Sequence, residues 1–210
     1  MANQIDGDVT INGALNVLGS ISGPIARTNL MAEANTVVGV PLSEFVVWDS
    51  VTQAFLPSVG AADDCGMVLG AFGTALPYIG SKQLNAAGAS TQYARTQVVV
   101  PPEYIAGNAI SIRVYGGMIT SVASVSATVD CELYKAAKTS TLVSGSDLVS
   151  TAATTINSLT FAAVTFVVTP TTVSPGDLLD LRLALITNSA TASSHFAAVS
   201  AVDFLYATRG

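Results

Sequence analysis

The sequence predicts an all-β protein: an antiparallel, jelly-roll-like β-sandwich preceded by an extended N-terminal β arm. Three observations support this prediction. Segments that alternate apolar and polar residues recur at fairly even spacing, as at residues 110–115 and 125–134. Ser, Thr, Val and Gly are frequent, and these residues disfavour helix interiors. The first two dozen residues carry glycine at a six-residue step.

The N-terminal arm, residues 1–30, contains Gly7, Gly13 and Gly19 at this six-residue step. Because a strand alternates faces, so short a run has too little area to bury an apolar face within its own chain. We therefore expect it to pair with a neighbouring copy, most simply in a homotrimer. The expected assembly interface consists of two apolar phases between the glycines, Ile5, Ile11 and Val17 in one and Val9, Leu15 and Ile21 in the other.

The remainder of the chain divides into a connector and one large domain. Gly23-Pro24 ends the arm, residues 31–44 are interpreted as a connector, and residues 45–210 form the sandwich. About eight strands with long connections favour a jelly roll over a simple meander. The only helical periodicity is a weak one at residues 146–154. The segments with strand signals, from which the strands of the sandwich are drawn, are residues 45–48, 54–56, 65–72, 94–100, 110–115, 125–134, 155–160, 164–169, 178–186 and 197–206.

Composition and charge restrict the partners of the protein. Only 10% of the residues are charged, against about a quarter in an ordinary soluble domain, so we expect partner chains to cover much of the surface. The net charge is −6 and the basic residues are scattered, which excludes a phosphate-binding stripe and predicts no nucleic-acid partner. The sequence shows neither a signal-peptide pattern nor a long uninterrupted apolar run, so we expect no export by a standard route and no membrane partner.

The two cysteines, Cys65 and Cys131, are 66 positions apart and have no CxxC or CxxH companion. This spacing disfavours a zinc site and does not settle whether they form a disulfide. We interpret them as small buried thiols.

Candidate catalytic residues are few. His195 could act as a general base beside Ser193 or Ser194, but a triad requires side chains that meet in space together with an orienting acid, so a loop or strand-edge histidine is favoured. We predict no catalytic residues.

The aspartates offer two other possibilities. Asp177 and Asp180 could form a glycosidase acid pair or a calcium site with backbone carbonyls, although no D-x-D-x-D-G loop is present. A turn role for Asp177 after Pro-Gly is favoured, and Asp63 and Asp64 are interpreted as solvated loop charges. We predict no metal and no cofactor.

Aromatic residues could provide a carbohydrate platform, formed by Trp48 with Phe45 and Tyr78. Because aromatic residues make up only 7% of the chain, a core position for Trp48 is favoured.

Several segments resemble bacteriophage virion proteins of jelly-roll type: residues 102–107, 126–135, 155–160 and 174–182. The N-terminal glycine step is similar to the β segments of trimeric phage fibres and spikes. The resemblance implies a virion component made in the host cytoplasm and placed on the capsid surface, with the major capsid protein as partner. It implies no active-site residues.

Three functions are therefore expected in order of preference. The first is a structural virion protein, a cement protein that decorates and stabilises a bacteriophage capsid through multimeric, arm-mediated contacts. The alternative is a tail-fibre or receptor-binding head domain that recognises a host-surface glycan. The third is a carbohydrate-active enzyme or lectin-like module, which the sequence supports least.

Overall fold

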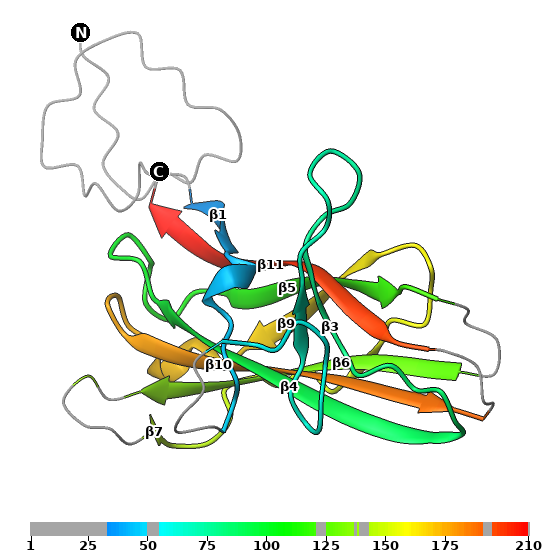
Figure 1. The fold of residues 1–210 in the computed structure, drawn as a ribbon. Coiled ribbons are helices and arrows are strands. Elements are labelled where there is room, and N and C mark those ends of the chain that lie inside the picture. The colour runs from blue at the N-terminus through cyan, green and yellow to red at the C-terminus, as the bar shows by residue number, and fades with distance from the viewer. Residues whose placement is uncertain are drawn as a thin grey trace, which may run out of the picture. The chain divides into compact units, whose positions relative to one another are not determined.

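The computed structural model describes residues 33–49, 55–120, 125–136, 138, 143–190 and 195–209. Within them the chain forms two antiparallel β-sheets (Figure 1). The six expected arm residues, Ile5, Val9, Ile11, Leu15, Val17 and Ile21, lie outside the described residues.

The first sheet has the strand order β2-β3-β11-β5-β9, and β1 also pairs with β11. Since β5 follows one edge of β11 along most of its length, β1 and β3 share the other edge. A register shift between Val199 and Ala201 marks a β-bulge in β11. The strands are β1 (Glu33–Val40), β2 (Gly66–Val68), β3 (Tyr78–Gly80), β5 (Ile110–Met118), β9 (Ala162–Val168) and β11 (Ala197–Arg209).

The second sheet has the order β4-β10-β6-β7, and β8 pairs with the same outer edge of β6 as β7. Two single-turn 3-10 helices, η2 (Leu42–Glu44) and η3 (Pro170–Thr172), lie in connections between strands. In the described part of the chain, no helix is long and apolar enough to cross a membrane. The strands are β4 (Gly88–Val99), β6 (Val125–Ala136), β7 (Val143–Ser144), β8 (Thr154–Thr155) and β10 (Leu178–Ser189).

The connectivity is that of a jelly roll. β4, β5 and β6 alternate between the two sheets, and so do β9, β10 and β11. Within these two runs, strands that are adjacent in the chain therefore face each other across the core, while their hydrogen-bonded neighbours come from distant parts of the sequence. This is the double Greek-key arrangement that the spacing of the predicted strands favours. The short pairs β2 with β3 and β6 with β7 are adjacent in the chain and lie in the same sheet.

The central strand of the second sheet, β10, shows how the sequence pattern separates the core from the outer face. β10 pairs along its whole length with β4 on one side and β6 on the other. Its leucines at alternate positions point into the core and are fully buried, whereas Asp180 and Arg182 point to the outer face. The largest fully buried side chains of the core are Phe45, Phe166, Phe204, Ile79, Ile110, Ile112, Met118, Leu133, Leu179, Leu181, Leu183 and Leu185.

The connector interpretation of residues 31–44 was wrong for most of its length. Residues Glu33–Val40 form β1, which pairs residue by residue with β11 from Val202 to Arg209. The eight residues of β1 include three valines and a threonine, a composition that suits a strand once β11 supplies the hydrogen bonds.

The weak helical periodicity at residues 146–154 does not correspond to a helix. This segment instead runs beside two strands and exchanges hydrogen bonds with them. The Oδ1 atom of Asp147 accepts the N–H groups of Leu133 and Val149, and the N–H of Ser150 donates to the carbonyl of Val167. These long-range partners replace the intrahelical bonds that the local periodicity suggested.

Predicted strand 65–72 is shorter than expected. β2 ends at Val68, and the N–H groups of Thr74 and Ala75 both donate to the carbonyl of Ala71, which closes a turn between β2 and β3. A side chain at Gly70 would collide with the carbonyl of Ala75, so a glycine is required where the two arms of this hairpin approach each other.

The interpretation of the cysteines as buried thiols is confirmed. Cys65 and Cys131 are both free and buried in the core. Burial raises the pKa of each thiol above its usual range, which keeps the thiols protonated and poorly nucleophilic.

Truncation of a central core residue should be costly. Leu183→Ala removes a fully buried side chain from β10 and should lower the free energy of unfolding by about 2–5 kcal/mol in urea titrations. The matched control is Val99→Ala, because the Val99 side chain is 53% exposed; we expect a change within about 0.5 kcal/mol. Equal losses in the two variants would contradict the placement of β10 at the centre of the core.

Candidate functional site

The outer face of the second sheet brings charged and aromatic side chains together. Strand alternation turns Tyr93 and Arg95 of β4, Asp180 and Arg182 of β10, and Glu132 and Tyr134 of β6 to this face. In the antiparallel register, Arg182 lies opposite both Arg95 and Glu132, and Asp180 lies opposite Tyr134. Three strands that are far apart in the sequence thus contribute to one surface.

An antiparallel bridge between Val46 and Arg95 positions Trp48 on this face. Val46 pairs with Arg95 through both backbone hydrogen bonds, at 2.8 and 3.0 Å. This register places Trp48 beside Tyr93, and their ring centroids lie 4.8 Å apart at an interplanar angle of 49°. The indole Nε1 donates to Asp63 Oδ2 at 3.3 Å, which fixes the orientation of the ring.

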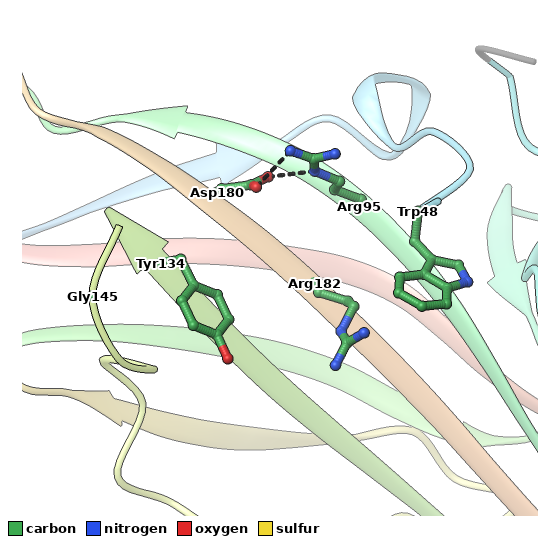
Figure 2. A pocket seen from close by; sticks show the side chains of 6 residues that line it. All are labelled: Trp48, Arg95, Tyr134, Gly145, Asp180 and Arg182. Carbon is green, nitrogen blue, oxygen red and sulfur yellow. Dashed lines mark hydrogen bonds and ion pairs between the residues drawn. The ribbon is translucent and has the colours of Figure 1, made fainter. Parts of the chain in front are cut away.

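Arg95 and Asp180 form a two-pronged ion pair (Figure 2). The guanidinium donates from Nε to Oδ1 at 2.7 Å and from Nη2 to Oδ2 at 2.6 Å. The hydrogen bond to Asp180 raises the pKa of Arg95, and the charge of Asp180 adds to the same effect against the opposing influence of burial. Since Asp180 is only 8% exposed, the fork satisfies a carboxylate that would otherwise be buried alone.

Arg182 occupies the middle of the face. Its Nε donates to Glu132 Oε2 at 2.6 Å, and its Nη2 contacts the same oxygen. The guanidinium carbon lies 4.8 Å from the Trp48 ring centroid and 4.6 Å from that of Tyr93. Ion pairing and cation–π contacts therefore hold this side chain from two directions.

These side chains border a groove of about 380 Å³, here called the Trp48 groove, lined by Trp48, Arg95, Tyr134, Gly145, Asp180 and Arg182. In Figure 2 the rings of Trp48 and Tyr134 lie on either side of Arg182. The two arginines of the lining are each paired with an acid, so the groove combines aromatic surfaces with hydrogen-bonding groups whose charges cancel.

The core interpretation of Trp48 was wrong, because this residue is only half-buried and lines the groove. The proposed aromatic platform does not form either. Phe45 points into the core, and Tyr78 stacks on Phe196 at 6.3 Å in a different pocket. A ring partner that sequence reasoning missed, Tyr93, takes their place because the bridge at Val46 sets its position.

The interpretation of Asp177 as a turn residue is confirmed. Its Oδ2 accepts the N–H of Ser174 at 2.8 Å and contacts Lys135 Nζ at 2.7 Å. Because Asp180 is paired with Arg95, the two aspartates of the hypothetical acid pair take part in separate ion pairs.

His195 is buried and forms a β-bridge with Leu84, as a strand-edge histidine should. Ser193 and Ser194 lie outside the described residues. Among the described residues, no three His, Cys, Asp or Glu side chains are placed to hold a metal ion.

The interpretation of Asp63 and Asp64 as solvated charges was wrong, since both are half-buried against β4. Burial is the main cause that raises the pKa of Asp64, and the charges of Asp63 and Asp49 raise it further, against a hydrogen bond from the Trp48 backbone. The loop thus holds the Asp64 carboxyl, next to the Trp48 backbone, in surroundings that disfavour its ionised form.

No protein-family model matches this chain, and no curated protein matches it. Solved structures that are similar to this chain share little sequence identity with it. One comes from a study of promiscuous carbohydrate-binding modules of the β-sandwich superfamily (13% identity, TM-score 0.35); the alignment covers 83% of this chain but only 56% of that chain.

The second is TmCBM61 in complex with β-1,4-galactotriose (9% identity, TM-score 0.36, covering 84% of this chain and 88% of that one). The third is a family 30 carbohydrate-binding module of a cellulosomal cellulase from Clostridium thermocellum (10% identity, TM-score 0.37, covering 80% and 96%). The likeness concerns the β-sandwich architecture alone.

The Asp64 carboxyl should give the protein a measurable pH dependence. The pKa of Asp64 in the folded state is raised from its ordinary value of 3.8. The free energy of unfolding therefore falls as the pH rises from this ordinary value through the raised pKa of the folded protein. Asp64→Asn keeps an acceptor for the backbone N–H of Trp48 and removes the negative charge. We expect a Tm higher than wild type by about 1–2 °C at pH 7 and no difference at a pH below the ordinary value.

The control is Glu44→Gln, an exposed carboxylate for which we expect equal melting temperatures at both pH values. A lower Tm for Asp64→Asn at pH 7 would show that the Asp64 charge is favourable.

Proposed function

We propose that this chain is a non-enzymatic recognition protein whose jelly-roll domain binds an uncharged saccharide in the Trp48 groove, as a tail-fibre or receptor-binding head domain would bind a host-surface glycan. The observation that carries the proposal is the combination, in one groove, of two aromatic rings with two arginine–carboxylate pairs.

The aromatic rings suit one face of a sugar. A pyranose ring presents a face of C–H groups that packs on an aromatic surface, while its hydroxyls require hydrogen-bonding partners. Trp48 and Tyr134 on either side of Arg182 offer such surfaces at two positions along the groove.

The ion pairs suit the hydroxyls. A guanidinium has five N–H donors, and Arg95 uses two of them on Asp180, so donors remain for a ligand. Since each arginine is already neutralised by a carboxylate, a charged ligand would have to compete with an ion pair. An uncharged polyhydroxylated ligand can add hydrogen bonds without breaking one.

A second candidate function is capsid decoration. The observation that favours it is the glycine-stepped segment at residues 1–30 with its two apolar phases, which is typical of a chain that assembles in copies. In that case the protein is a homotrimeric cement protein on the virion surface and binds the major capsid protein. Quantitative mass spectrometry of purified particles separates the two candidates, because decoration requires many copies per particle and a tail fibre only a few.

Saccharide binding can be tested with the full chain on an array of uncharged oligosaccharides, followed by titration calorimetry on the best binder. Trp48→Ala and Tyr134→Ala should each weaken binding about tenfold or more, because each removes one stacking surface. Tyr78→Ala is the matched control, since Tyr78 lies in a different pocket, and it should bind like wild type. Absence of binding to every uncharged oligosaccharide, or equal loss in all three variants, would refute the proposal.

The assembly role of the arm has its own test. Deletion of residues 1–23 should leave the sandwich folded, with an unchanged circular dichroism spectrum, but abolish trimerisation as measured by light scattering. Val9→Asp, Leu15→Asp and Ile21→Asp together should reproduce the deletion, because they would bury charge in a paired face. A truncated protein that remains trimeric and still binds particles would show that the arm is incidental.

A further inference from the structure

The hairpin between β2 and β3 carries three of the four most exposed large apolar side chains of the described residues; the other is Phe55, at 76%. Phe72 at its tip is fully exposed at 104%, and Leu69 and Leu76 are 78% and 76% exposed. Figure 1 shows this loop, coloured teal, projecting beyond the strands of its sheet. Residues 69–77, here called the apolar hairpin, contain no charged residue.

Hydrogen bonds hold the tip of the hairpin in a defined turn. The N–H groups of Thr74 and Ala75 and the hydroxyl of Thr74 all donate to the carbonyl of Ala71 at 3.0 Å. Gly73 has a φ of +80°, a conformation that glycine adopts without strain. These bonds hold Phe72 away from the sandwich, so its exposure is set by the turn and little ordering remains to be done on binding.

A groove lies at the base of the same hairpin. Its volume is about 360 Å³, and it runs between the hairpin and η2. None of its lining residues is charged: Leu42, Ser43, Met67, Leu69, Leu76, Pro77 and Ser200. The hairpin therefore presents an exposed apolar side chain, Phe72, at its tip and an uncharged groove at its base.

We propose that the apolar hairpin is an interface between two copies of this chain, in which Phe72 of each copy enters the groove at the hairpin base of the other. Phe72 follows Val68 by four positions, which is about 13 Å of extended chain. Two hairpins side by side in opposite directions therefore bring each tip to the other's base, and one two-fold axis forms both contacts.

Charge and area favour a second copy as the occupant. Each chain carries a net charge of −6, so two copies repel each other at long range. Because neither residues 69–77 nor the groove lining contains a charged residue, copies that meet there place no like charges in direct contact, and salt screens the more distant ones. Large apolar side chains present on the order of 150 Å² each. Burial of Phe72, Leu69 and Leu76 from both copies removes on the order of 900 Å², and the remaining apolar lining of the groove, Leu42, Met67 and Pro77, brings the total to on the order of 1,000 Å², the size that a specific interface has to reach.

Engineered cysteines test the geometry in the full chain. Ser43→Cys and Ala71→Cys combined in one chain, with Phe72 kept, should give covalent dimers on mild oxidation, because the exposed tip residue Ala71 then lies beside the groove of the partner copy. The native thiols are buried and contribute no background. Each single variant should stay uncrosslinked. Dimers from Ala71→Cys alone would show that tips meet tips, and no dimers in the double variant would show no contact; both results would overturn the proposal.

Sedimentation velocity over a dilution series tests the energetics. Phe72→Asp should weaken association of full-length chains at least tenfold, with an unchanged melting temperature because the side chain makes no core contact. Leu159→Asp is the matched control, since Leu159 is 58% exposed on another connection, and it should associate like wild type. Identical association of both variants with wild type would refute the interface and leave the Trp48 groove proposal unaffected.

Discussion

The structure depends on the pairing of β10 with a full-length neighbour on each side. Because β4 and β6 satisfy both of its edges, the leucines on its inner face can be fully buried without leaving a backbone group unpaired. The same alternation turns Asp180 and Arg182 outward, where each takes a partner from a different neighbouring strand. One strand thus carries the centre of the core and the centre of the candidate site.

The two proposed surfaces belong to different sheets. The Trp48 groove lies on the outer face of β4, β10 and β6, whereas the apolar hairpin joins β2 and β3 of the first sheet. The surfaces also differ in chemistry. The groove is rich in hydrogen-bonding groups with cancelling charges, which suits a hydrated ligand, and the hairpin is uncharged and apolar, which suits a dry contact. A molecule built this way can associate through one sheet while the other stays open to a ligand.

Much of the fold could be predicted from the sequence, and little of the site. The alternation at residues 125–134 and the leucine run of β10 indicated half-buried antiparallel strands, and both are present. Residues 33–40 were misinterpreted because a strand on a sheet edge is stabilised by its partner more than by its own pattern. Asp180 and Trp48 drew attention by residue type, but their partners did not, because these lie far away in the chain: Arg95 is 85 positions from Asp180, and Trp48 contacts Tyr93 and Arg182.

By itself, the sequence determined the class of the fold, the approximate positions of the longer strands, the burial of the two cysteines and the turn role of Asp177, because these follow from local periodicity and local hydrogen bonding. Only the tertiary structure decided which strands are neighbours. In a jelly roll, the hydrogen-bonded neighbours of the long strands are distant in the chain, so contacts such as Arg95 with Asp180 join residues 85 positions apart. Their register is set by packing across the whole sheet, and no window of sequence contains it.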